Sequence, residues 1–392
     1  MKKFCYFPGK VCLGTLCLTL FLLTGCAAAT SPEESASAPS SAPSAEETPE
    51  PIQSADPVEK LLASMTTEEK VGQIFFVRCP DENAADDVSA YHPGGVLLFG
   101  RDFKGKTYGA VRMQTDALQH AAAIPLLIGT DEEGGSVVRA SSNPYLRAEK
   151  FPAPRTLYEN GGVDALCADA AEKSSFLLGL GVNVNFAPVC DIAADSSDYI
   201  YPRTIGADAE ATAQAVAAVT ETMKHAGIGS VLKHFPGYGN NVNTHDGISV
   251  DKRPMSSFED CDFLPFSAAI QSGADAVLVS HNIVACMDDS LPASLSPEVH
   301  ALLRDELHFD GVIMTDDLSM DALQQYTEDG SAAVLAVLAG NDMLVATDYT
   351  VQIPQVLSAV KDGTISTARL DDAVFHVLKW KQRLGLIEAQ TA

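Results

Sequence analysis

Gly311-Val312-Ile313-Met314-Thr315-Asp316-Asp317-Leu318-Ser319-Met320-Asp321 is the stretch of the chain that decides its fold class. Its apolar residues from Val312 to Met314 stand between a glycine and a pair of carboxylates, which is typical of a short buried strand. Asp316 and Asp317 therefore stand where this strand ends. In α/β barrels the residues that carry chemistry lie at the carboxyl ends of the strands.

The acidic pair has two interpretations. Aspartate is a preferred N-cap, so the pair could serve only to start the next helix. One carboxylate is enough for a cap, and Asp317 is the better placed of the two. We therefore expect a helix to follow this strand, with Asp317 as its cap and Asp316 as the candidate for chemistry.

Short apolar runs of strand length recur along the chain, and stretches with helical spacing separate most of them. The predicted strands are 74–77, 96–99, 126–128, 182–186, 230–232, 276–279, 312–314 and 343–345. The predicted helices include 56–65, a helix capped by Thr66 or Thr67, and then 107–122, 164–180, 208–226, 257–272 and 297–307. Residues 353–387 are predicted to form terminal helices that pack against the strands.

Alternating strands and helices imply parallel βα units. Eight such strands predict an α/β fold, a (β/α)8 TIM-type barrel that forms a single catalytic domain over residues 57–392. The alternative is an open doubly wound sheet. A dinucleotide-binding fingerprint would favour that sheet, and none follows the first predicted strand.

The first 25 residues are predicted to be a secretory signal. Lys2, Lys3 and Lys10 precede an apolar run over 11–23, and small residues follow it. Leu23-Thr24-Gly25-Cys26 resembles a bacterial lipobox, in which the cysteine becomes the lipidated first residue. An ordinary cleaved signal with an incidental cysteine is the alternative.

Residues 26–56 are predicted to be a lipidated cysteine followed by a disordered tether. Serine, proline, alanine and glutamate dominate this stretch, and no lysine or arginine occurs between Lys10 and Lys60. So little apolar surface cannot offset the entropy of ordering the chain. We therefore expect an extracytoplasmic lipoprotein that is held to the cell membrane by its lipid anchor only.

The formal net charge of −26 argues against nucleic acid as a partner and leaves a neutral sugar possible. The cysteines that follow Cys26 are odd in number, irregularly spaced and without a CxxC pair. We therefore expect no disulfide framework, no metal site and no cofactor. The protein is expected to be a monomer.

Polar residues follow the predicted strands, and a barrel would bring them together at one rim. The segments are Asp131-Glu132-Glu133-Gly134-Gly135 with Arg139, Tyr201-Pro202-Arg203, Lys233-His234-Phe235-Pro236-Gly237-Tyr238-Gly239 with His245, and Thr315-Asp316-Asp317-Leu318-Ser319-Met320. Mixed charges above an apolar scaffold predict a polar pocket.

These motifs, in this order, resemble glycoside hydrolase family 3, in the branch of single-domain β-N-acetylglucosaminidases that act on cell-wall fragments. The resemblance covers the chain from Asp56 onward. It implies a retaining mechanism in which Asp316 is the nucleophile and forms a covalent glycosyl-enzyme. It also implies that a set of polar residues holds the sugar hydroxyl groups, namely Asp131, Arg139, Arg203, Lys233 and His234. Structural ion pairs of Arg139 and Lys233 with Asp131 or Asp191 are the alternative.

The resemblance places the acid/base on a loop after the fifth strand, where an Asp-x-His pair is expected. His245 occupies the histidine position, but Asn243 replaces the partner carboxylate. Asp246 is a second possible partner, and a loop histidine without a role is the alternative.

The resemblance predicts an exo-acting hydrolase that removes terminal β-linked N-acetylglucosamine from peptidoglycan fragments or related oligosaccharides. A phosphorylase is an alternative, because Asn243 removes a charge that would repel phosphate. A β-glucosidase is another. An inactive sugar-binding lipoprotein is the non-enzymatic alternative, although a binding protein would not need Asp316.

Overall fold

The computed structural model describes residues 56–193, 195–241, 247–326 and 331–388. The predicted signal, Cys26 and most of the predicted tether lie outside these residues, as do Asn243, His245 and Asp246, so these assignments remain predictions. None of the helices in the described ranges combines the length and hydropathy that a membrane span needs.

Eight parallel strands form one sheet in the order β10-β1-β2-β3-β4-β5-β7-β9. The strands are β1 (Phe75–Arg78), β2 (Gly95–Leu98), β3 (Leu127–Thr130), β4 (Val184–Asn185), β5 (Gly229–Phe235), β7 (Ala276–Val279), β9 (Val312–Thr315) and β10 (Leu344–Ala346). Every predicted strand is confirmed, with ends shifted by a few residues. A small parallel pair, β6 (Val250–Asp251) and β8 (Ile283–Val284), stands apart.

The sheet curls into a nearly closed barrel, which rules out the open doubly wound alternative. β10 pairs with β1 on one side and reaches β9 on the other through a bridge between Met314 and Met343. Across this seam, Asp342 N donates to Ile313 O at 2.8 Å, and Val345 N donates to Thr315 Oγ1 at 3.1 Å. The carboxyl ends of the strands therefore lie on one rim.

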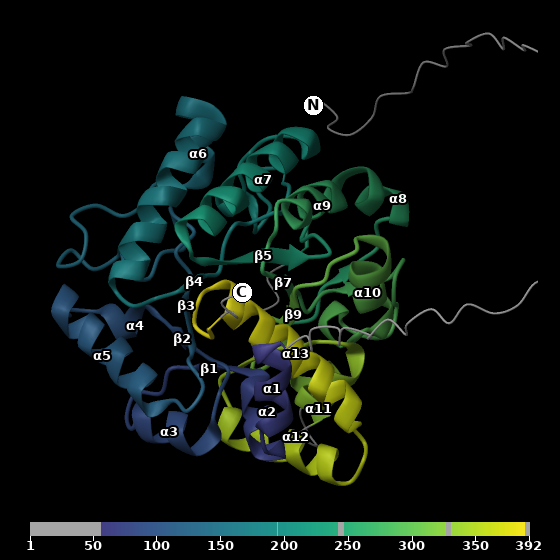
Figure 1. Cartoon of the computed structure of the whole chain (residues 1–392). Helices are drawn as coiled ribbons and strands as arrows, with labels where there is room; N and C mark the ends of the chain where they lie inside the picture. Colours follow the sequence, from purple (N-terminus) through teal and green to yellow (C-terminus); the bar gives the residue numbers. More distant parts are fainter. Residues whose placement is uncertain (1–55, 194, 242–246, 327–330, 389–392) are drawn as a thin grey trace, which may run out of the picture. The chain divides into compact units, whose positions relative to one another are not determined.

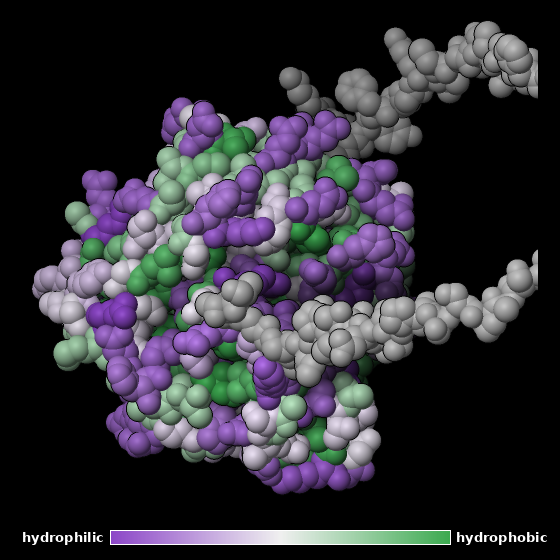
Figure 2. All heavy atoms as spheres, viewed as in Figure 1, coloured by the Kyte–Doolittle hydropathy of each residue, from purple (hydrophilic) through white to green (hydrophobic). Residues whose placement is uncertain are grey.

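Helices surround the strands (Figure 1). They are α1 (Pro57–Ser64), α2 (Thr67–Gln73), α3 (Ala84–Tyr91), α4 (Gly100–Phe103), α5 (Tyr108–Ala121), α6 (Pro154–Gly179), α7 (Ala209–Ala226), α8 (Met255–Ser257), α9 (Phe263–Gln271), α10 (Pro297–Ala301), α11 (Ser331–Ala339), α12 (Tyr349–Lys361) and α13 (Thr367–Arg383). On the face in Figure 2, hydrophilic residues cover the outer helices and hydrophobic ones show between them.

Three helix predictions need correction. The stretch 297–307 is an α-helix only over Pro297–Ala301 (α10), because a π-helical turn over Leu302–Glu306 follows it. The stretch 257–272 is not one α-helix, because a π-helical turn over Phe258–Asp262 separates α8 from α9. No α-helix begins after Asp317: a turn and a short 3-10 helix over Asp321–Tyr326 come first. The predicted cap of α2 is confirmed at Thr66, whose hydroxyl accepts from Glu69 N at 3.2 Å.

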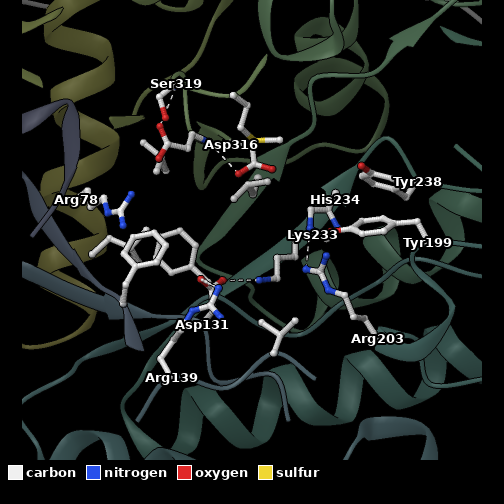
Figure 3. A pocket seen from close by; sticks show the side chains of 18 of the residues that line it. Arg78, Asp131, Arg139, Tyr199, Arg203, Lys233, His234, Tyr238, Asp316 and Ser319 are labelled. Carbon is white, nitrogen blue, oxygen red and sulfur yellow. Dashed lines mark hydrogen bonds and ion pairs between the residues drawn. The ribbon is translucent and has the colours of Figure 1, made fainter. Parts of the chain in front are cut away.

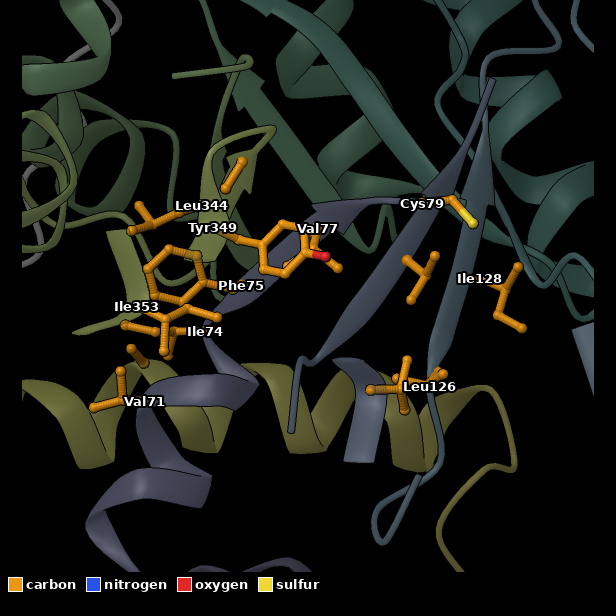
Figure 4. Close-up of a cluster of buried hydrophobic side chains, with 14 of the residues drawn as sticks. Val71, Ile74, Phe75, Val77, Cys79, Leu126, Ile128, Leu344, Tyr349 and Ile353 are labelled. Atoms are coloured by element: carbon orange, nitrogen blue, oxygen red, sulfur yellow. The ribbon is translucent and has the colours of Figure 1, made fainter. Parts of the chain in front are cut away.

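Side chains alternate between the barrel interior and the helices, as the two-residue period of a strand requires. Phe76, Leu97, Leu127, Val231 and Met314 belong to the interior cluster. Their strand neighbours pack outward against the helices, and Figure 4 shows part of this outer core, where β1, β3 and β10 meet α2 and α12. The alternation fixes which rim residues face inward.

Helix α13 closes the amino-terminal end of the barrel. Val377 and Trp380 join the interior cluster, and Trp380 is fully buried. A Cβ atom on Gly229, at the start of β5, would lie 2.9 Å from Trp380 Nε1, so no larger residue fits there without a shift. The opposite, carboxyl end remains open for a site.

Asp342 stabilises the seam between β9 and β10. Its Oδ2 accepts from Ile313 N at 2.9 Å and from Arg304, and its Oδ1 lies 3.3 Å from Arg369 Nη2 and 3.2 Å from His376 Nδ1. Burial alone would raise the pKa of this carboxyl, but His376 and the two arginines hold it below its usual value. The carboxylate is therefore charged and paired inside the protein.

We predict that Asp342→Asn lowers the free energy of unfolding by about 3–5 kcal/mol, because two arginines lose a buried partner. Urea unfolding followed by the fluorescence of Trp380, the one tryptophan of the sequence, would measure it. Because the pKa of Asp342 is lowered in the folded protein, its carboxylate stabilises the fold at pH values above the pKa of the unfolded state. This stabilisation is lost as the pH falls through the folded-state pKa. The difference from wild type should therefore shrink towards acid pH.

Asp372→Asn is the matched control. Asp372 also pairs with Arg369, at 3.1 Å, but its side chain is 60% exposed. Exposed pairs contribute about 0–1 kcal/mol. Equal losses for the two variants would contradict a special role of Asp342 at the seam.

Candidate active site

Five rim residues enter the pocket because each stands two positions beyond an interior residue of its strand. The inward-facing strand positions are Phe76, Leu97, Gly129, Val231 and Met314. Because the side chains of a strand alternate between its two faces, the residue two positions further along each strand also faces inward. These rim residues are Arg78, Phe99, Asp131, Lys233 and Asp316. All five line one cavity of about 380 Å³, which is within the usual size range of small-molecule pockets.

Six residues predicted from the sequence to act in catalysis or sugar binding come together here. The cavity is lined by Asp131, Arg139, Arg203, Lys233, His234 and Asp316, and Figure 3 shows them around one space. The structure thus brings these residues together, while their chemical roles remain proposals. The seventh predicted residue, His245, lies outside the described residues.

Asp131 is held by two cations. Its Oδ1 accepts from Lys233 Nζ at 2.8 Å, and its Oδ2 lies 3.3 Å from Arg139 Nη2. Arg139 and Lys233 therefore form the structural ion pairs with Asp131 that were predicted as the alternative. Among the described residues neither cation pairs with Asp191, because that carboxylate pairs with His234 instead.

Glu133 organises the wall of the pocket, although its sequence motif alone did not indicate such a role. It is buried, it accepts from Arg203 at 2.7 and 2.9 Å, and it lies 2.6 Å from Lys233 Nζ. Burial would raise the pKa of Glu133, but Lys233 and Arg203 hold it well below the usual range. Burial would likewise lower the pKa of Arg203, yet Glu133 holds it above its usual value. Both groups are therefore charged.

His234 is oriented from both sides of its ring. Its Nδ1 donates to Asp191 Oδ2 at 2.6 Å, and Arg203 Nη2 lies 3.1 Å from its Nε2. Because a guanidinium can only donate, Nε2 accepts and the ring proton belongs on Nδ1. Asp191 also accepts from His234 N at 3.1 Å and Tyr238 N at 2.7 Å, which ties the loop after β5 to the loop after β4.

The neighbouring aspartates at the end of β9 differ in their surroundings. Asp316 N donates to Val279 O at 3.1 Å, which anchors this position to β7, and Asp316 Oδ1 accepts from Asp317 N at 2.8 Å. Asp317 accepts from Ser319 N at 3.0 Å and from Thr347 Oγ1 at 2.6 Å. The carboxylate of Asp317 thus stabilises the turn and links it to the end of β10, although both aspartates line the cavity.

Arg78 and Tyr199 also line the cavity and were missed from the sequence. Arg78 could have been found by the rule that identified Asp316, because it directly follows the apolar run 74–77. Tyr199 comes from the loop after β4, and its ring centroid lies 5.7 Å from that of Tyr238. No periodic pattern in the sequence marks a residue of that kind.

One group of metal-ligand side chains converges among the described residues, formed by Asp342, Asp372 and His376. It does not belong to the lining of the cavity. Arg304 and Arg369 already pair with Asp342, so two positive charges stand where a cation would bind. This arrangement favours an ion-pair cluster.

Comparison with known proteins agrees with this geometry. The model of the glycosyl hydrolase family 3 N terminal domain matches residues 66–380. A β-hexosaminidase of Hydrogenovibrio crunogenus is 31% identical over 70% of this chain and 78% of its own. A β-N-acetylglucosaminidase structure from Paenibacillus is 31% identical with a TM-score of 0.77, over 84% of this chain and 64% of that one. The β-glucoside phosphorylase BglX is 26% identical with a TM-score of 0.75, over 85% of this chain and 60% of that one.

The matched barrel residues include every described motif from which the site was built. The chain spans most of the Hydrogenovibrio protein and somewhat less than two thirds of the two structures. The chain belongs to glycosyl hydrolase family 3, and it is a glycoside hydrolase whose polar pocket lies at the carboxyl end of a (β/α)8 barrel.

Proposed function

We propose that the protein is a retaining exo-β-N-acetylglucosaminidase that acts on peptidoglycan fragments or related oligosaccharides. The observation that carries the proposal is the position of Asp316 in a cavity whose other walls present the paired charges of Asp131, Lys233 and Arg203. The names of the Hydrogenovibrio and Paenibacillus relatives support an N-acetylated hexosamine as the sugar.

The proposed reaction has two steps. An oxygen of Asp316 attacks the anomeric carbon, and the bond to the leaving oxygen breaks as that oxygen takes a proton from His245. Water then attacks the anomeric carbon, His245 accepts its proton, and the bond to Asp316 breaks. Asp131 accepts from sugar hydroxyl groups, and Arg139, Arg203, Lys233 and His234, which line the same cavity, complete the binding site.

A closed end favours an exo-acting enzyme. The cavity lies above an interior that is filled by apolar side chains and sealed below by α13, so a glycan can enter it only from the open rim. The pocket is rimmed on one side by Tyr199 and Tyr238, whose rings offer an apolar surface beside the charged groups. A terminal sugar fits such a site better than an internal one.

Phosphorolysis is the second candidate. The likeness to the BglX phosphorylase and the presence of Asn243 in place of a carboxylate both favour it. The two functions share the first step and differ in whether water or phosphate attacks the glycosyl-enzyme.

The first prediction for the proposed function concerns the nucleophile. Asp316→Asn should lower kcat by at least about 1000-fold, because an amide cannot form the covalent intermediate. Asp317→Asn is the matched control and should retain far more activity, because its carboxylate binds the turn and Thr347. A 2-fluoro glycoside followed by peptide mass mapping should label Asp316. A label on Asp317 would overturn the assignment.

The second prediction concerns the substrate. The enzyme should prefer aryl β-N-acetylglucosaminide over the matched aryl β-glucoside by at least about tenfold in kcat/KM, because a site built for the acetamido group leaves polar atoms unpaired with the glucoside. Assays with and without phosphate, with detection of sugar 1-phosphate, separate hydrolysis from phosphorolysis. Equal efficiency on both glycosides would exclude the proposed sugar specificity.

The third prediction concerns His245. Without a general acid, His245→Ala should slow substrates with poor leaving groups by about 100-fold or more and activated aryl glycosides far less. Azide should partly restore turnover of the activated substrates. Asn243→Asp should raise activity on natural disaccharides, because it restores the partner carboxylate that the sequence motif is expected to carry. A uniform loss on all leaving groups, without rescue, would assign His245 a structural role.

A further inference from the structure

Among the described residues, Arg78 is a cation in the cavity wall without a hydrogen-bonding or acidic partner. It ends β1 two positions beyond Phe76, an interior residue, so its side chain faces the cavity that it lines. Its Nε is buried and has no hydrogen-bond partner. Throughout the described ranges, no carboxylate or carbonyl accepts a hydrogen bond from this guanidinium, and no dashed line reaches it in Figure 3.

The other cations of the cavity are all neutralised by acidic side chains. Arg139 pairs with Asp131, Arg203 with Glu133, and Lys233 with both carboxylates. Their charges therefore position the sugar site without requiring a charged ligand. Buried polar groups in proteins nearly always have a partner, so an unpaired guanidinium in a binding cavity indicates a partner supplied by the ligand.

Phe99 holds the guanidinium in place. The guanidinium carbon of Arg78 lies 4.5 Å from the centroid of the Phe99 ring, which follows β2 at the same rim. A guanidinium over an aromatic face keeps its N–H groups in its own plane, where they remain available to a ligand. The planar fork of donors matches the two oxygens of a carboxylate or phosphate.

The charge of the surrounding rim restricts where an anion can bind. Asp131, Asp316, Asp317 and Asp321 line the same cavity and would repel it. Figure 3 shows Arg78 on the side of the cavity away from His234, Arg203 and Tyr199. An anionic group would therefore bind beside the sugar site, at Arg78.

We propose that Arg78 is an oxyanion subsite that determines specificity, taking either a carboxylate carried by the group linked to the N-acetylglucosamine or an inorganic phosphate. The proposal rests on the proposed function, because it places the anion next to the same scissile bond. In a peptidoglycan fragment the neighbouring sugar carries a lactyl carboxylate, which has the required chemistry.

The test uses two disaccharides that differ in one group. Both carry N-acetylglucosamine β-1,4-linked to a hexosamine with a 3-O-lactyl group, which is a carboxylate in one and its amide in the other. For Arg78→Met, the ratio of kcat/KM on the acid to that on the amide should fall about tenfold to hundredfold, since hydrogen bonds to charged groups are worth that factor. Arg78→Lys keeps the charge but loses the planar fork, so its acid-to-amide ratio should lie between those of wild type and Arg78→Met.

Arg112→Met is the matched control, because Arg112 is a surface arginine that pairs with Asp116 outside the cavity. Its ratio should equal that of wild type. If Arg78→Met does not fold, Arg78→Lys carries the same comparison. If Arg78→Met keeps the acid-to-amide ratio but loses the phosphate-dependent formation of sugar 1-phosphate, the oxyanion is phosphate and the subsite is supported.

An unchanged ratio together with an unchanged phosphate dependence would overturn the proposal. An equal loss of kcat/KM on the acid and the amide would also overturn it, because Arg78 would then support the cavity wall without distinguishing a charged ligand from a neutral one. If wild type cleaves neither disaccharide, the proposed function fails separately. Calorimetric binding of the two disaccharides to the wild-type protein and to Arg78→Met then still compares acid with amide.

Discussion

Closure of the barrel between β9 and β10 is the constraint on which the site depends. These two strands meet through a short bridge and a few backbone hydrogen bonds, and the buried carboxylate of Asp342 adds contacts to Ile313 N and to the guanidinium groups of Arg304 and Arg369. Without this set of contacts the ends of β9 and β10 would be free to separate. Asp316 and Thr347, which follow those strands, would then no longer share a rim.

Charge pairing within the rim then gives the pocket its shape. Removing Glu133, Lys233 and Arg203 from water is costly, and their mutual contacts at 2.6–2.9 Å offset that cost. Each charged group also restrains its neighbours, because Arg203 contacts His234 and Lys233 contacts Asp131. If these groups bind the sugar as proposed, they need little reorganisation when a substrate arrives.

The strand period explains why adjacent aspartates can have different functions. Asp316 stands an even number of residues beyond Met314, so it faces the interior, while Asp317 turns towards Thr347. The same period brings Arg78 to the rim from β1. One geometric rule thus accounts for both the proposed nucleophile and the proposed oxyanion subsite.

The sequence by itself determined the eight strands, their order along the chain and the residues that follow them. Short apolar runs and the residues that bound them are local signals. The sequence also identified Asp316 from its place after a strand, and the resemblance of its motifs to a known family supplied the five sugar-binding candidates. Only the tertiary structure decided which charges pair. Asp191 pairs with His234, and Glu133 with Arg203, across 43 and 70 residues of chain. Such partners are chosen by distances that exist only after the barrel closes, so no local pattern encodes them.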